Sequence, residues 1–377
     1  MKKNLFMVAA VALVALVSCN KETNSSLQPA PVSDIKFEAE IAQTKTSIGD
    51  PDSEGNRDAT WVRGDQVNIN GTLFTATGFK EDGKAIFETE NLDFTVAEQY
   101  DAIYPATAGT SLEAVTIPAA QDGTFANAAI AVAQSENRSL SFLNVASLLR
   151  FQVPADYASV TIESTANLAG TVSVTFDEDG TPVIGEVTNA SNVITLNDVK
   201  ADVDYYVAIL PDNHKFTVRL DGYLSKASTK TLSIARANMI NLQKLPAPEE
   251  CEWYLVGQHQ NWTLSAAKVT PLYKVEENLY VARNLSLKDS GFKLTQKNNT
   301  NWDKVFGSHD ANYKYTVGTD GWYTGLYTNN RGDKTNDIKL SNWSGPFDVY
   351  IRYVQVATWG KELGFAIVKT GDAYPTY

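Results

Sequence analysis

The chain has 377 residues and a formal net charge of −12. Of its 32 basic and 44 acidic residues, 14 and 12 lie in residues 251–377, so 18 and 32 remain in residues 1–250. This acidic balance lacks the basic footprint that nucleic-acid binding needs, and we exclude nucleic acid as a partner.

Residues 1–18 are predicted to be a lipoprotein signal peptide. Two lysines precede an apolar run, residues 5–17, which is too short to span a bilayer. A small residue, Ser18, then leads directly into Cys19. A cysteine at this point is where lipid is attached after cleavage. We therefore expect Cys19 to anchor the mature chain to a membrane without spanning it.

Residues 19–33 are polar and rich in serine and proline, which predicts a flexible tether. Their start, residues 20–22, reads Asn-Lys-Glu. This resembles the signal that sends lipoproteins of Bacteroidota to the outer face of the outer membrane. The resemblance implies an outer-membrane protein that faces the exterior. If Cys19 carries lipid, Cys251 is the only remaining cysteine, and no disulfide framework is expected.

Residues 34–246 are predicted to be all-β. Short runs alternate apolar and polar residues, as in 171–176 and 215–220, and Asp-Gly turn signals separate them. The alanine-rich stretch 126–134 has helical propensity, but Ile130 and a valine two residues later alternate with alanines, so we predict a strand.

Seven phrases in this region occur in a fixed order. They lie at residues 44–48, 60–67, 100–105, 115–118, 141–151, 204–211 and 232–242. Together they resemble the fimbrillin-like lipoproteins that build type V pili. The resemblance implies two transthyretin-like β-sandwiches in tandem, at residues 34–150 and 151–246, and other pilus subunits as partners. We call residues 34–246 the stalk.

Shaft members of that family polymerise by strand exchange after proteolysis beside an arginine. The resemblance makes Arg57 and Arg63 the candidate cleavage sites. This chain departs from a shaft subunit because a further domain follows the stalk, which favours a tip, accessory or independent surface role.

The sequence predicts no cofactor, no metal site and no enzymatic activity. Residues 50–54 place acidic oxygens at alternate positions, as a calcium loop does, but Trp61 stands where the bidentate glutamate belongs. Three histidines are spread over the chain without a catalytic motif around them.

A proline-containing linker, residues 246–250, precedes the C-terminal domain, residues 251–377, which we call the head. About seven alternating runs predict an immunoglobulin-like β-sandwich there. The head holds six of the chain's seven tryptophans and eleven of its seventeen tyrosines. That density exceeds what a core of this size needs, because tryptophan is rarely fully buried.

The order of phrases in the head resembles the carbohydrate-binding modules of outer-membrane starch-utilisation lipoproteins. The matching pieces are residues 254–257 with Trp262, 291–294, 301–302, 336–340 and 347–353. The resemblance implies a surface module that holds a polysaccharide on aromatic rings with polar neighbours.

Tryptophans in polar loops have little hydrophobic reason to be there, and flat rings can stack on the C–H faces of sugars. The predicted glycan contacts are Trp302, Trp322 and Trp359, with Tyr323, Asn301 and Lys304 as flanking or polar contacts. The alternative is that these rings clamp long loops onto the sandwich. Trp262 is either part of the platform or a plug at one end of the sandwich.

The preferred hypothesis is a lipid-anchored surface protein whose fimbrillin-like stalk presents a glycan-binding head for adhesion or polysaccharide capture. Its partners would be a polysaccharide or host glycan and, through the anchor, the outer membrane. The alternative is a pilus accessory, tip or anchor subunit that makes only protein contacts.

Overall fold

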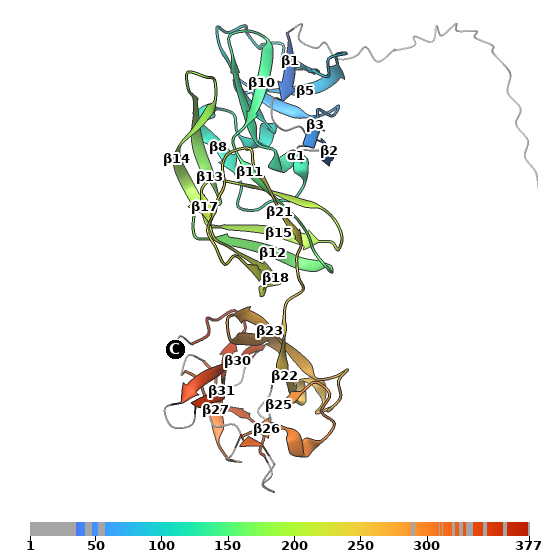
Figure 1. Cartoon of the computed structure of the whole chain (residues 1–377), viewed down its shortest axis with the longest axis vertical. Helices are drawn as coiled ribbons and strands as arrows, with labels where there is room; N and C mark the ends of the chain where they lie inside the picture. The colour runs from blue at the N-terminus through green and yellow to red at the C-terminus, as the bar shows by residue number, and fades with distance from the viewer. Residues whose placement is uncertain are drawn as a thin grey trace, which may run out of the picture.

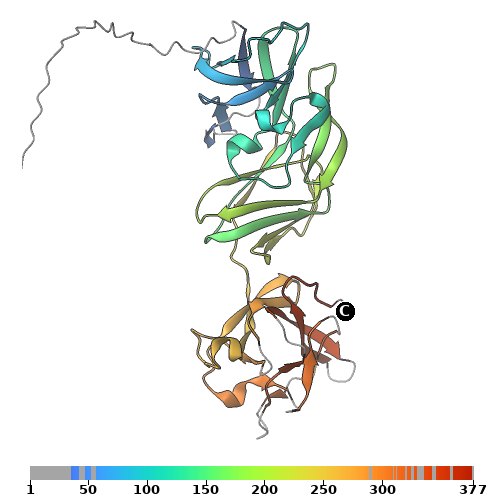
Figure 2. The same cartoon turned by 180° about the vertical axis from the view of Figure 1, so that it is seen from behind.

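The structure is a computed structural model. It describes residues 35–41, 47–51, 57–287, 291–308, 310, 312–318, 321–323, 327–328, 335–341, 345–356 and 360–375. Figures 1 and 2 show strands through the whole described chain and two bodies joined by a short connection. The prediction of an all-β fold is confirmed. None of the helices in the described ranges is long and apolar enough to cross a membrane.

The first part of the stalk is a barrel of seven strands. In sheet order they are β1 (Lys36–Ile41), β10 (Ser139–Asn144), β9 (Ala131–Ser135), β7 (Tyr100–Tyr104), β4 (Gln66–Ile69), β5 (Thr72–Phe79) and β6 (Ala85–Glu88). β1 runs parallel to β10 and antiparallel to β6, so the first strand closes the barrel. The sequence resemblance had implied a transthyretin-like sandwich for this part of the stalk. A hairpin, β2 (Ser47–Pro51) and β3 (Arg57–Thr60), precedes β4.

Aromatic rings fill the barrel because inward positions recur at every second residue. Phe37 meets Phe74 and Tyr100 edge to face, with ring centroids 5.1 and 4.8 Å apart. Trp61 packs in the same way against Phe87 at 5.0 Å. Trp61 is 6% exposed, so this tryptophan belongs to the core.

The alanine-rich stretch predicted as one strand is a helical turn followed by a strand. Residues Phe125–Ala128 form α1, and β9 starts at Ala131, so the prediction is wrong for the first part. The physical reason lies before the turn. The Asp122 carboxylate accepts hydrogen bonds from the Thr124 backbone N–H at 2.8 Å and from the Asn127 side-chain amide at 2.6 Å, which closes the turn locally.

The rest of the stalk consists of small sheets. Their strands are β15 (Val193–Val199), β12 (Tyr157–Ser164), β18 (Phe216–Leu220) and β19 (Tyr223–Ala227) in one; β16 (Tyr205–Ile209), β11 (Ser147–Gln152) and β21 (Met239–Lys244) in the next; β14 (Pro182–Ser191), β13 (Ala169–Phe176) and β8 (Val115–Ile117) in a third; and β17 (Asn213–His214) with β20 (Leu232–Ser233). Two 3-10 turns, η1 (Ala106–Ala108) and η2 (Leu112–Ala114), lie between β7 and β8.

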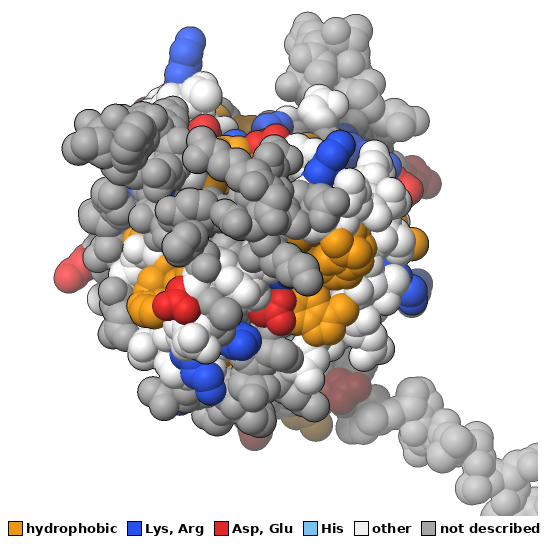
Figure 3. Space-filling model, turned by 90° about the horizontal axis from the view of Figure 1, so that it is seen from below, with side chains coloured by type: hydrophobic (Ala, Val, Ile, Leu, Met, Phe, Trp, Pro, Cys, Tyr) orange, Lys and Arg blue, Asp and Glu red, His pale blue; other side chains and the backbone are white. Residues whose placement is uncertain are grey.

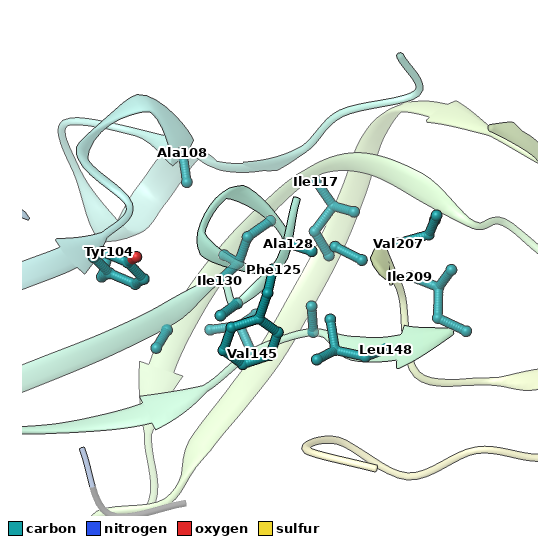
Figure 4. Close-up of a cluster of buried hydrophobic side chains, with 14 of the residues drawn as sticks. Tyr104, Ala108, Ile117, Phe125, Ala128, Ile130, Val145, Leu148, Val207 and Ile209 are labelled. Atoms are coloured by element: carbon teal, nitrogen blue, oxygen red, sulfur yellow. The ribbon is translucent and has the colours of Figure 1, made fainter. Parts of the chain in front are cut away.

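One continuous hydrophobic cluster runs through the stalk, from Phe37 to Leu245. Figure 4 shows where the barrel and the following sheets meet: Phe125 of α1 lies between Ile130 and the side chains of Leu148 and Val145. The two parts of the stalk therefore share a core, and neither buries its apolar side chains alone.

The head is a long curved sheet with its own core. The strand order is β28 (Tyr327–Thr328), β26 (Phe306–Gly307), β25 (Phe292–Gln296), β22 (Glu250–Gly257), β23 (Thr270–Glu276), β24 (Leu279–Leu285), β30 (Phe347–Val356) and β31 (Gly360–Lys369). A second sheet pairs β27 (Lys314–Thr316) with β29 (Lys339–Ser341). Phe292 of β25 and Phe365 of β31 lie with ring centroids 6.1 Å apart, so the sheet curls until distant strands meet.

Described side chains of the head and the stalk meet around Tyr223, which also packs against a hydrophobic cluster of the head, and we call this contact the joint. Tyr223 of the stalk lies 5.0 Å from Tyr273 of the head between ring centroids. The guanidinium carbon of Arg283 lies 5.4 Å from the centre of the Tyr223 ring. Arg219 Nη1 donates to the Val275 carbonyl oxygen at 2.7 Å. These contacts hold β23 beside β19.

Candidate functional site: an aromatic pair on the head

Trp302 stands on a short polar turn and is one of the large exposed hydrophobic side chains. It begins η4 (Trp302–Lys304) and is 41% exposed. Asn299 holds the turn in place: its Oδ1 accepts from the Asn301 backbone N–H at 2.9 Å, and its side-chain amide donates to Thr295 Oγ1 at 3.0 Å. Because Thr295 belongs to β25, the loop that carries the indole is tied to the sheet.

Trp262 comes from a different loop and meets Trp302. It follows η3 (Gln258–Gln260), and the two ring centroids are 6.3 Å apart with planes tilted by 50°. The backbone N–H of Trp262 donates to the Gly257 carbonyl oxygen at 2.8 Å. Sequence reasoning left the role of Trp262 undecided. Asn261, the preceding residue, favours a left-handed turn, but no feature of the sequence indicates that the Trp262 ring would contact Trp302.

Two lysines, Lys293 and Lys304, place charged amino groups near the Trp262–Trp302 pair. Lys293 Nζ lies 6.0 Å from the centre of the Trp302 ring, donates to the Thr335 carbonyl oxygen at 2.8 Å and lies 3.5 Å from an Asp337 carboxylate oxygen. Lys304 is exposed at the end of η4. The site therefore combines flat apolar rings with hydrogen-bond donors, which is the chemistry that sugar recognition uses.

The pair differs from the head's other described tryptophans in its packing. Trp253 packs against the main head cluster, with its ring 4.7 Å from that of Phe306, and its Nε1 donates to Tyr353 Oη at 3.1 Å. Neither Trp262 nor Trp302 packs against any hydrophobic cluster of the described residues. The exposed Trp302 ring and the half-buried Trp262 ring therefore lie outside the described clusters.

Figure 3 views the head end-on. On the described part of this face, hydrophobic side chains form small groups between polar and charged ones, and no broad apolar sheet is seen among the coloured atoms. Small groups of this kind suit a ligand that is itself part apolar and part polar, rather than a large dry protein interface.

Trp322 and Tyr323 were predicted to share the platform, and the structure places them elsewhere. Trp322 is half-buried against a second cluster, donates from Nε1 to the Pro375 carbonyl oxygen at 3.0 Å, and has the guanidinium of Arg352 4.9 Å above its ring. The hydroxyl of Tyr323 donates to the Thr316 carbonyl oxygen at 3.0 Å. Their described contacts share no residue with those of Trp302, so the structure does not bring the rings together.

The remaining predicted residues fall into two groups. Asn301 and Lys304 are exposed next to Trp302 in the chain, and their role as glycan contacts stays a prediction. Trp359 and Cys19 lie outside the described residues. Arg57 begins β3, and its side chain is likewise outside the described set.

Arg63, the other candidate cleavage residue, is exposed on a tight turn before β4. The Asp65 backbone N–H closes the turn by donating to the Val62 carbonyl oxygen at 3.1 Å, and the Gly64 backbone N–H ties it to β5 by donating to the Ala76 carbonyl oxygen at 2.9 Å. The Asp65 carboxylate accepts from the Val62 backbone N–H at 2.6 Å. A peptide bond on an exposed turn is reachable by a protease.

Two titratable groups, the half-buried His259 and the buried Cys251, support the head without belonging to the aromatic pair. Burial lowers the pKa of His259, in η3, to about 4, and its Nε2 hydrogen-bonds with Thr270 Oγ1 at 2.9 Å. A neutral imidazole therefore anchors the turn that leads to Trp262. Burial raises the pKa of Cys251 to about 11. Across the described ranges, no group of three His, Cys, Asp or Glu could hold a metal ion.

No family model matches the chain, and no curated protein matches it. Among solved structures, it is similar to a candidate cell adhesion protein from Bacteroides ovatus, with 13% identity, a TM-score of 0.34, and 55% of this chain and 92% of that one covered. A second, from Bacteroides uniformis, has 15% identity and a TM-score of 0.33 over 64% and 98%. A fimbrial protein from Bacteroides ovatus has 14% identity and a TM-score of 0.24 over 58% and 52%. At TM-scores below 0.5, these similarities do not establish a shared fold.

Proposed function

We propose that the protein is a surface-exposed outer-membrane lipoprotein in which a fimbrillin-like stalk presents a glycan-binding head for adhesion or polysaccharide capture. The observation that carries the glycan site is the pairing of Trp262 with Trp302 outside every described hydrophobic cluster. Trp302 is exposed and Trp262 is half-buried. Indole rings that are at least partly open to solvent and lie outside a core can stack on sugar rings.

The arrangement of the two bodies suits presentation. β23 contacts the stalk, whereas the segment between β25 and β26, which carries Trp302, lies on the far side of the head (Figures 1 and 2). A lipid on Cys19 would hold the opposite end of the molecule at the membrane. The site would then face away from the anchor.

The test is affinity electrophoresis and calorimetry of the full mature chain against α-glucans, mannans and host glycans. We expect at least one of them to bind, and W302A to lose most of the affinity because one of the two rings is gone. Y313A is the matched control, because Tyr313 is an exposed aromatic of the head, 48% accessible, that lies outside the pair. If wild type binds none of the panel, or W302A binds as wild type does, the glycan site is wrong.

The second candidate function is a pilus accessory, tip or anchor subunit, and the exposed Arg63 turn favours it. Cleavage there would detach β1, which closes the barrel between β10 and β6, and would leave both of those strands with unpaired edges. An arginine-specific protease should then convert wild type, but not a variant that combines R57A with R63A, into oligomers on size exclusion. Cleavage at Arg63 without any oligomer would count against this role.

A further inference from the structure

We propose that Trp262 is a second ligand-binding ring, held by a strained left-handed turn, and that the Trp262–Trp302 pair is a two-ring platform already formed before ligand arrives. This inference rests on the proposed glycan function and deepens it. It assigns a binding role to a residue that sequence reasoning left undecided.

The first argument is the backbone. Asn261 has φ 60° and ψ 35°, and Trp262 follows with φ 52°, so two consecutive residues lie in the left-handed region. Asparagine tolerates that region, but an indole-bearing residue is a clear outlier there because its Cβ crowds the following carbonyl. Residues in such conformations persist where the surroundings over-determine them, and they cluster at ligand sites.

The surroundings here do over-determine the turn. The Gln260 side chain clasps Thr263 from both sides: its Oε1 accepts from the Thr263 N–H at 2.6 Å, and its amide donates to the Thr263 carbonyl oxygen at 2.9 Å. Trp262 itself is fixed between them by its bond to the Gly257 carbonyl oxygen. Three hydrogen bonds thus fix the backbone from which the indole projects.

The second argument is that Trp262 makes few packing contacts that would offset the strain of its backbone conformation. A core tryptophan such as Trp253 has both a cluster against its ring and an acceptor for its Nε1. In the described part of the chain, Trp262 packs against no hydrophobic cluster and its Nε1 donates to no acceptor. Its described ring partner is Trp302. An indole kept there for stability alone would be a poor choice.

The geometry of the pair points to the ligand class. Two rings 6.3 Å apart and tilted by 50° cannot both lie flat on one small ligand, but each can stack on a separate unit of a chain. The platform therefore fits an oligosaccharide of two or more pyranose units with exposed C–H faces, and not a single free sugar. Because the turn holds Trp262 before binding, little ordering entropy is lost when the chain docks.

W262N tests the proposal, because asparagine accepts the left-handed backbone that tryptophan resists. We expect the thermal midpoint of the head to stay the same or to rise, while affinity for a polysaccharide of the panel that binds wild type falls at least tenfold. W253N is the matched control and should lower the midpoint by several degrees. If W262N lowers the midpoint as much as W253N does, or keeps wild-type affinity, Trp262 is a packing residue and the inference is overturned.

The two failures can be told apart. If wild type binds and W302A loses binding but W262N does not, only the inference falls. If wild type binds no glycan, the proposed function falls and takes the inference with it. Far-ultraviolet circular dichroism gives a separate test: the exciton couplet of the two indoles should be present in free wild type, absent from W262N and unchanged by ligand. A couplet that arises only after ligand addition would overturn the preformed platform.

Discussion

Replacing Tyr223 with alanine should release the head from the stalk without unfolding either body. Tyr223 is the central ring of the joint: it meets Tyr273 at 5.0 Å and lies under the guanidinium of Arg283 at 5.4 Å. A short hydrogen bond from Arg219 Nη1 to the Val275 carbonyl oxygen also joins the stalk to the head. The substitution therefore removes the aromatic half of the joint and leaves the polar half.

The magnitude follows from these contacts. An aromatic pair contributes about 0.5–1.5 kcal/mol beyond its buried area. A cation over a ring adds about 0.5–2 kcal/mol, depending on how far it is desolvated. Together they amount to roughly 1–3.5 kcal/mol, which raises the population of the open arrangement by roughly 5- to 300-fold. The linker at residues 246–250 would then be the main remaining restraint.

The assay is the distribution of distances between spin labels placed on the stalk and on the head, with limited proteolysis of the linker as a second readout. We expect Y223A to broaden the distribution and to speed linker cleavage, and Y313A to do neither, because Tyr313 lies away from the joint. A distribution as narrow as that of wild type would show that the joint does not depend on Tyr223 and would refute the reasoning.

Three further outcomes are expected. Because the pKa of His259 is lowered to about 4, its imidazole takes up a proton at higher pH in the unfolded chain than in the folded chain. The free energy of unfolding should therefore be highest above about pH 6.5 and fall by on the order of 3 kcal/mol towards pH 4. H259Q should remove this pH dependence in denaturant titrations. Burial raises the pKa of the Cys251 thiol to about 11, so a thiol reagent at pH 8 should modify it only on the timescale of unfolding; fast labelling of the native protein would contradict its burial. W322A should destabilise the head by about 2–3 kcal/mol, since its ring packs on a cluster and its Nε1 bonds to Pro375, and should leave glycan affinity unchanged; a loss of affinity would return Trp322 to the platform.

The aromatic clustering shows how far loop residues can be assigned without coordinates. A tryptophan among asparagines, such as Trp302, could be recognised as exposed because nothing nearby in sequence offered it a core. Trp322 stands in equally polar surroundings, yet its ring packs against strands that are distant in sequence, and its Nε1 donates to the Pro375 carbonyl oxygen near the end of the chain. Local composition reports what flanks a side chain, and it does not report what folds over it.

The sequence by itself determined the all-β class and the separation of an acidic stalk from an aromatic head, because alternation with period two and turn residues are local properties of the chain. It could not determine which rings become neighbours. Trp262 and Trp302 lie forty residues apart. Because β22 and β25 are antiparallel neighbours, the loops that follow them leave at opposite ends of the pair, and the two rings meet only through the paths that these loops take in the folded head. Closure of the barrel by β1 and the contact of Tyr223 with Tyr273 are decided in the same way, by strand register and long-range packing that no local pattern encodes.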